Sequence, residues 1–107
     1  MESTFRVIAR STDSSDYITI AGNIDATAEK QLQSIPDMLD TQTAYFDFSQ
    51  TGRINSMGIA LLLRCFKKIR EEKRAAIFLR ELNTTNTMLF KMTGVFLLAS
   101  LETRTSR

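Results

Sequence analysis

The sequence has no histidine, no tryptophan, and only one cysteine and one proline among its 107 residues. Without histidine, the protein lacks histidine general bases, serine–histidine–aspartate triads and histidine-ligated metal sites. The single cysteine, Cys65, excludes an internal disulfide and a cysteine zinc cluster, and its place near an apolar stripe indicates a packed thiol. A hydrolase would need a serine activated by lysine or a carboxylate, and no spacing identifies such a base. We therefore expect a protein that is not an enzyme, with no catalytic residue, metal or cofactor.

Long apolar runs and an excess of one charge are also absent. The longest purely apolar runs, residues 59–63, 75–79 and 95–99, are far shorter than the roughly 20 residues of a membrane-spanning helix. Residues 1–4 lack the basic segment and apolar core of a signal peptide. The 14 basic and 12 acidic residues give a net charge of +2, which is too balanced to indicate nucleic-acid or anionic-membrane binding. We expect a cytoplasmic protein that binds neither nucleic acid nor a membrane.

Hydrophobic residues make up 43% of the chain and charged residues 24%, as in an average globular protein. At 107 residues, this composition predicts a single domain over 1–107. We expect its core over about residues 5–101 and a frayed tail over 102–107. The short tail and balanced composition favour a monomer.

The first third of the chain predicts two strands and a helix. Residues 5–9 and 17–21 are rich in strand formers and are separated by a polar loop, which indicates an antiparallel hairpin. Asp25 can cap the helix that follows, in which apolar residues recur every three or four positions. Pro36 lies inside this pattern and is expected to kink the helix or split it near Ile35.

The remaining chain alternates strands with helices. Residues 45–48 predict a strand and residues 49–55 a loop, after which an amphipathic helix runs from Ser56 to about Lys73. The apolar run 75–79 suits a strand buried on both faces. A third helix, capped within residues 82–85 with Thr84 or Thr85 as candidates, should stop at Gly94, and residues 95–98 form a last strand or a final turn.

This order predicts an α/β fold. Strands that alternate with helices pair in parallel, while the leading hairpin makes the sheet mixed. We expect a small mixed β-sheet of about five strands, built from the N-terminal hairpin and then parallel βαβ units, with the helices mainly on one face.

Ser56 stands where a strand-fed loop turns into the strongest predicted helix. A serine at a helix N-cap has its hydroxyl beside unpaired backbone N–H groups and the positive end of the helix dipole. Gly58 follows two residues later, where the absent side chain leaves room for another molecule. Such a site suits an anion, and a phosphate on Ser56 would be well placed. The plain alternative is that Ser56 only caps the helix.

Four short segments share their order and spacing with one known family. Residues 46–49, Phe-Asp-Phe-Ser, correspond to a strand that ends Asp-Leu-Ser. Residues 54–62 correspond to a loop with Asp-Ser-Ser-Gly and the amphipathic helix after it. Residues 21–25 and 89–95 are similar to a hairpin-to-helix segment and to a late helix that ends in Thr-Gly. Over residues 5–101 the chain thus resembles STAS domains, the family of sulfate transporters and anti-sigma factor antagonists.

The resemblance implies a bacterial partner-switching regulator. In this family the unmodified domain binds a regulator, commonly a serine kinase that doubles as an anti-sigma factor. The kinase phosphorylates the serine at the helix start and the complex dissociates, and a metal-dependent serine phosphatase reverses the mark. The acceptor falls on Ser56 here, and Asp25 and Asp47 match acidic positions near that loop. Gene expression, biofilm formation or stress behaviour would be controlled in this way.

Two residues depart from the family pattern. Asn55 stands where Asp is usual, which puts the efficiency of phosphorylation in question, and Met57 stands where Ser is usual. Met57 either offers an adaptable apolar side chain to a partner or folds back onto the core. The resemblance therefore predicts a partner-binding surface and surroundings of the phosphosite, the first comprising Asn23, Asp25, Asn55, Ser56, Met57 and Gly58 and the second Asp47 and Ser49.

Two other functions are compatible with the same residues. The first is a nucleotide- or anion-binding module at the N-terminus of the Ser56 helix, although the loop lacks phosphate-loop spacing. The second is a constitutive protein-binding scaffold in which Ser56 is never modified. Ser49 is a second possible acceptor, but a role in the turn after the strand is the simpler interpretation.

Overall fold

The predicted N-terminal hairpin opens the structure, a computed structural model that describes residues 5–102. Strand β1 (Arg6–Ser11) pairs antiparallel with the longer β2 (Asp16–Ile24). The frayed tail predicted over 102–107 lies outside the described residues except for Glu102. The backbone N–H of Glu102 donates to Leu79, so this residue continues the sheet rather than fraying.

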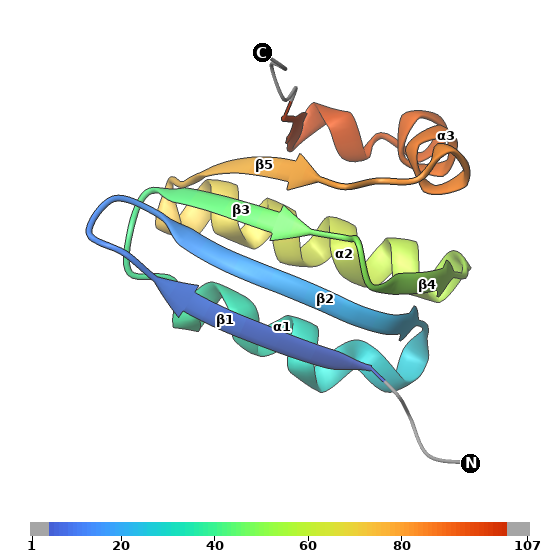
Figure 1. Cartoon of the computed structure of the whole chain (residues 1–107), viewed down its shortest axis with the longest axis horizontal. Coiled ribbons are helices and arrows are strands. Elements are labelled where there is room, and N and C mark those ends of the chain that lie inside the picture. Colours follow the sequence, from blue (N-terminus) through green and yellow to red (C-terminus); the bar gives the residue numbers. More distant parts are fainter. Residues whose placement is uncertain (1–4, 103–107) are drawn as a thin grey trace.

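The hairpin is extended into a mixed sheet of six strands, in agreement with the predicted fold class (Figure 1). Its further strands are β3 (Thr43–Asp47), β4 (Thr51–Ile54), β5 (Ala76–Arg80) and β6 (Ser100–Leu101). The order across the sheet is β1-β2-β3-β5-β6, and β4 pairs with β2 off this path. All pairs except the hairpin are parallel.

Strand β4 was not predicted, because its sequence Thr-Gly-Arg-Ile has no apolar alternation. It forms because β2 runs on to Ile24, beyond the end of β3, and leaves backbone groups to pair there. Thr51 and Ile54 pair with Gly22 and Ile24, and the Thr51 hydroxyl donates to the carbonyl of Ile20 at 2.7 Å. The residues between Asp47 and Ser56 are therefore held against the sheet.

Two of the three helices cover one face of the sheet, as predicted (Figure 1). They are α1 (Glu29–Met38), preceded by the 3-10 turn η1 (Ala26–Ala28), and α2 (Ser56–Lys68), which continues as the π-helical turn η2 (Ile69–Lys73). Helix α3 (Thr84–Thr93) and the 3-10 turn η3 (Val95–Leu97) lie beyond β5. The apolar stripe of α2 is buried, and its Phe66 ring meets that of Phe46 edge-on at 5.0 Å. No helix within residues 5–102 has the length and apolarity to cross a membrane.

Of the two effects expected of Pro36, a kink or a split near Ile35, the split does not occur. Helix α1 continues through Pro36 to Met38. Proline removes one backbone donor, and a position in the last turn leaves few further helical bonds to disturb. The carbonyl of Pro36 still accepts the N–H of Leu39 at 3.4 Å, which closes the helix.

The expectation that β5 is buried on both faces is wrong. Ile77 and Leu79 are buried beneath the helices, but alternate residues face the opposite side and are half-buried. On that side Tyr17, Tyr45 and Phe78 stack across three strands, with ring centroids 5.3 Å apart. The second face of the sheet is therefore aromatic and no helix of the described residues covers it.

Asp16 joins the hairpin to the loop that follows α1. Its buried carboxylate accepts the hydroxyls of Ser11 at 2.5 Å and Thr41 at 2.7 Å, and the backbone N–H groups of Thr41 at 2.9 Å and Asp40 at 3.2 Å. Burial alone would raise the pKa of Asp16, but these hydrogen bonds outweigh it and lower the pKa.

We predict that Asp16→Asn destabilises the fold at neutral pH and removes part of its acid sensitivity. Because the folded pKa is lowered, Asp16 contributes its full stability above the unperturbed value of about 3.9 and loses it as pH falls through the folded pKa. Urea unfolding at several pH values checks this. Parallel stability–pH curves for the two proteins below that value would contradict it.

Gly58 sets how closely α2 approaches β2. A Cβ atom on Gly58 would lie 2.1 Å from the carbonyl oxygen of Ile24, so only glycine permits this contact. The space expected beside Gly58 for another molecule is filled by strand β2, and Gly58 is buried. The expectation that Gly58 leaves open space beside the site is therefore wrong.

Gly58→Ala should lower the free energy of unfolding by about 3 kcal/mol, since rigid backbone must move to admit the methyl group. Gly52→Ala is the matched control, because the added carbon would meet only the side chain of Asn23, which can rotate. Rotation of Asn23 would break the hydrogen bond that its Oδ1 accepts from the N–H of Arg53. We therefore expect the control to lower the free energy of unfolding by about 1 kcal/mol, the value of one hydrogen bond. Urea unfolding compares the two, and equal losses would contradict the assigned contact.

Candidate functional site

Ser56 is the first residue of α2, and the cap before it is Asn55. The backbone of Asn55 is extended, and its Oδ1 accepts the N–H of Gly58 at 2.8 Å. The N-cap role expected of Ser56 is thus wrong. Asparagine caps a helix as well as serine does, and Asn55 is held in place because its own N–H donates to the carbonyl of Ile24 at 3.2 Å.

This shift by one residue leaves the Ser56 hydroxyl unused. The Ser56 side chain is exposed and has no hydrogen bond to any part of the described chain. Its neighbour Met57 is 47% exposed, so of the two placements considered for Met57 the structure has the one that faces solvent. A hydroxyl and a thioether therefore project together from the first turn of α2.

The other predicted partner-binding residues hold the backbone around Ser56. The Oδ1 atom of Asn23 accepts the N–H of Arg53 at 2.8 Å and so fixes β4 beside β2. Asp25 accepts the N–H of Thr27 at 2.9 Å and its hydroxyl at 2.5 Å, and these bonds lower the pKa of the Asp25 carboxyl. Asn23, Asp25 and Asn55 lie near the end of β2 and support Ser56 rather than compete with it.

Three helix starts come together at this end of the sheet (Figure 1). Asp25 caps η1, Asn55 caps α2, and Asn83 caps α3 by accepting the N–H of Asn86 at 2.7 Å. The cap thus lies within the expected residues 82–85, at Asn83 rather than at Thr84 or Thr85. Helix starts carry partial positive charge, so a negative group on Ser56 lies at a favourable edge of the molecule.

A shallow hollow of about 620 Å³ lies beside the first turn of α2. Part of its wall comes from β4 and the loop before α2, and part from α3. Its lining residues are Asn23, Thr51, Gly52, Arg53, Ile54, Asn55, Asn83, Thr85, Asn86 and Leu89. Arg53 was expected only as part of the loop over residues 49–55, and Asn83 only as part of a capping segment.

Asp47 and Ser49, the expected surroundings of the phosphosite, belong to the end of β3 and to the turn after it. Asp47 lines a hollow on the open, aromatic face of the sheet together with Tyr45 and Arg80, whereas α2 covers the opposite face. The Oδ1 atom of Asp47 accepts the N–H of Ser49 at 2.7 Å, which makes the turn after β3. Ser49 is exposed.

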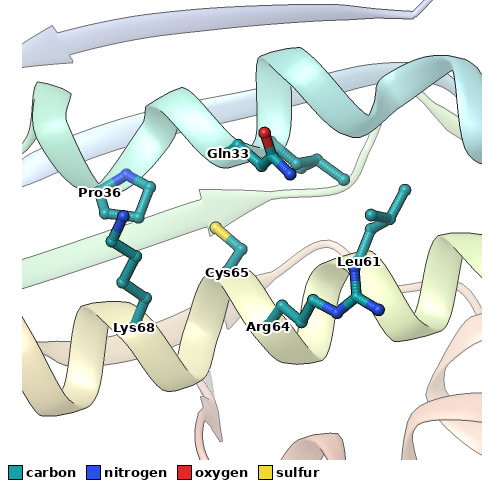
Figure 2. A pocket seen from close by; sticks show the side chains of 7 residues that line it. Gln33, Pro36, Leu61, Arg64, Cys65 and Lys68 are labelled. Carbon is teal, nitrogen blue, oxygen red and sulfur yellow. The ribbon is translucent and has the colours of Figure 1, made fainter.

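Cys65 lies at a second hollow, of about 380 Å³, between α1 and α2. Figure 2 shows its sulfur pointing toward α1, with the Lys68 amine and the Pro36 ring to one side. The thiol is buried, and this raises its pKa to about 12 despite the opposing charge of Lys68. A thiol with that pKa is not a nucleophile near neutral pH. Within residues 5–102 no three cysteine, aspartate or glutamate side chains are grouped to hold a metal ion.

Comparison with known proteins gives a fold match. No family model matches the sequence, and no curated protein matches it. The Bacillus cell-fate determinant SpoIIAA in its phosphorylated form is similar with a TM-score of 0.63 and 16% identity, over 94% of this chain and 93% of that one. SpoIIAA has also been solved unphosphorylated, with a TM-score of 0.66, 18% identity and 95% and 90% coverage.

Two further structures agree. An anti-sigma factor antagonist from Mycobacterium paratuberculosis has a TM-score of 0.68 at 16% identity, with 94% and 87% of the two chains covered. A candidate anti-sigma factor antagonist from Thermotoga maritima has a TM-score of 0.74 at 11% identity, with 91% and 86% covered. The chain thus has the fold of the anti-sigma factor antagonists, which confirms the predicted STAS-like fold.

The cap that positions Ser56 is open to a direct test. Asn55→Ala should lower the free energy of unfolding by about 1 kcal/mol, because the N–H of Gly58 loses its acceptor. Asn55→Asp keeps an acceptor at the same place and should leave stability nearly unchanged. Urea unfolding of both variants measures this, and an aspartate variant as unstable as the alanine variant would contradict the capping role.

Proposed function

We propose that this protein is a non-enzymatic partner-switching regulator whose switch is Ser56. The unmodified chain binds a serine kinase of the anti-sigma type, phosphorylation of Ser56 ends that binding, and a metal-dependent serine phosphatase restores it. The protein would act in the bacterial cytoplasm on gene expression, biofilm formation or stress behaviour. The observation that carries the proposal is the exposed Ser56 hydroxyl, free of any bond to the described chain, at the start of α2.

The fold comparison supports a phosphorylation switch. SpoIIAA, an anti-sigma factor antagonist of this fold, is known in unphosphorylated and phosphorylated forms. A domain of this architecture therefore accommodates a phosphate group without loss of the fold. The comparison supports the class of regulator, while the assignment to Ser56 rests on the geometry of this chain.

The first turn of α2 suits a contact that a phosphate disrupts. Met57 presents apolar surface beside the hydroxyl, so a partner that covers one also covers the other. A phosphate adds about −1.5 to −2 charges. When a partner buries that charge without pairing it, the cost is several kcal/mol. A loss of about 3 kcal/mol weakens binding on the order of 100-fold.

The free protein tolerates the same group. The phosphate oxygens face solvent and the positive end of α2, which favours negative charge. The bonds that position the turn, from Gly58 to Asn55 and from Asn55 to Ile24, do not involve the Ser56 hydroxyl. Phosphorylation therefore acts on the contact surface itself and needs no rearrangement of the fold.

The convergence of three helix starts favours, as a second candidate, a nucleotide- or anion-binding module. Against it, side chains already occupy backbone donors there, since Asp25, Asn55 and Asn83 each accept an N–H of the turn they cap. Asp25 also adds a negative charge whose lowered pKa keeps it ionised at neutral pH. Because these N–H groups already donate to capping side chains, they are not available to bind an anion. A phosphorylation switch at Ser56 is therefore the better-supported function.

Ser56→Asp should weaken binding to the kinase by about 10- to 100-fold, whereas Ser56→Ala should bind normally and accept no phosphate. Ser49→Asp and Ser49→Ala are matched controls, because Ser49 is also an exposed serine close to the end of β3. Calorimetric titration with the kinase measures binding, and intact-mass measurement after incubation with ATP counts phosphoryl groups.

Retained binding by Ser56→Asp would leave a constitutive scaffold as the function. Phosphorylation that survives Ser56→Ala and disappears in Ser49→Ala would move the acceptor to the turn after β3. A defined heat of binding for nucleotides alone would favour the anion-binding module.

A further inference from the structure

The end of α3 and the turn after it expose apolar side chains far from the proposed kinase contact. Leu97 is 87% exposed and Met92 is 78% exposed, the two highest values among the large hydrophobic residues of the described chain. Met88, one helical turn before Met92, is also exposed. A contiguous apolar patch on a protein surface often marks a binding site. The site proposed around Ser56 does not include any of them.

A hollow of about 380 Å³ lies beside Leu97, which lines it. Leu63 of α2 and Leu97 and Leu98 at η3 give it apolar walls, and Thr93 and Gly94 close it at the end of α3. The left-handed backbone of Gly94, with φ of 86°, turns the chain from α3 into η3 and so opens the space. The hollow has the shape that accepts the apolar side chains of a docked helix.

The rim of this hollow is basic. Arg64 and Lys67 of α2 line it. Within residues 5–102 the one ion pair joins Arg80 to Glu102, so neither of these two cations is paired there. Glu71, one turn beyond Lys67, does not line the hollow. An apolar floor with a basic rim is complementary to an amphipathic helix that carries acidic residues beside its apolar face.

The same charges disfavour a second copy of this chain as the occupant. Self-association through this face would bring like charges together, which costs free energy. Acidic residues on a different protein would instead be attracted to these basic side chains, which favours binding.

The hollow also lies far from Ser56 along α2. The α2 residues that line the hollow run from Leu63, seven residues from Ser56, to Lys67, eleven residues from it, or about 10 to 16 Å along a helix axis. This exceeds the screening length of about 8 Å at physiological ionic strength. A phosphate on Ser56 therefore has little electrostatic effect at the hollow.

We infer that the face formed by Leu63, Arg64, Lys67 and Leu97 docks an acidic amphipathic helix of a partner protein, and that it does so whether or not Ser56 is phosphorylated. Because phosphorylation of Ser56 ends kinase binding at the first surface, this second surface takes a different partner protein. The inference goes beyond the proposed function and does not depend on the modification of Ser56.

The probe is a designed helical peptide with leucines at positions i, i+4 and i+7 and glutamates on both flanks. Its control is the same peptide with lysines in place of the glutamates. Fluorescence anisotropy with the full chain should show the acidic peptide binding about tenfold more tightly. Backbone amide shifts in the NMR spectrum should change at Leu63, Thr93, Gly94 and Leu97.

Leu97→Gln should weaken the acidic peptide about tenfold, or about 1.4 kcal/mol. The matched control is Met38→Gln, which changes another exposed apolar residue, 40% exposed, at the end of α1. Because both side chains are exposed, both variants should fold, and circular dichroism verifies this. Lys67→Glu should weaken the acidic peptide and favour the lysine peptide. Ser56→Asp should change the peptide affinity by less than about twofold.

Several results would overturn the inference. Equal binding of the two peptides, or unchanged binding by Leu97→Gln, would remove the docking surface. Loss of peptide binding in Ser56→Asp would merge the two surfaces into one. Binding of the wild type, but not of Leu97→Gln, to phosphatidylglycerol vesicles would make the face a membrane contact, and dimerisation lost in Leu97→Gln would make it a self-interface. A failure of Ser56 phosphorylation would leave all these measurements unaffected.

Discussion

The contact between the backbones of Gly58 and Ile24 determines where the first turn of α2 lies, and the proposed site depends on that turn. Only a residue without Cβ lets the helix come so close to β2. At this distance the N–H of Asn55 reaches the carbonyl of Ile24, and Asn55 can then cap the helix. Ser56 is left as the first helical residue, facing solvent.

Structural and functional roles are divided between neighbouring residues at this edge. The side chains of Asn23, Asp25 and Asn55 accept hydrogen bonds from backbone N–H groups, so these oxygens already have partners within the protein. Ser56 and Met57 are free to meet another molecule. A chemical change at Ser56 therefore alters what a partner contacts while the supporting bonds stay in place. Under the proposed function, this separation would let one hydroxyl act as a switch on a rigid domain.

The parts of the fold with strong periodicity were predictable from the sequence. The hairpin, the buried stripe of α2 and the end of α3 at Gly94 follow from alternation, helical spacing and the left-handed backbone that glycine permits. Strand β4 could not be predicted, because it forms only where β2 outlasts β3. Long-range pairing of this kind leaves no local pattern in four residues.

The start of α2 at Ser56 was predicted from the sequence, but the roles of Ser56 and Gly58 were predicted wrongly, for one physical reason. Ser56 and Asn55 are equally good caps by residue type, so only the bond from Asn55 to β2 decides between them. The role of Gly58 likewise depends on which backbone lies opposite, which spacing does not reveal. The positions of Asp47 and Ser49 depend on which face of the sheet α2 covers.

The most direct test of the central claim is to compare how strongly the kinase binds the unmodified chain and the chain phosphorylated on Ser56. Amide spectra of the two forms accompany the comparison. We predict a loss of about 100-fold in affinity, with spectral changes confined to the first turn of α2 and the adjoining end of β2. Equal affinities would contradict the account, as would spectral changes that spread through α1 and the core.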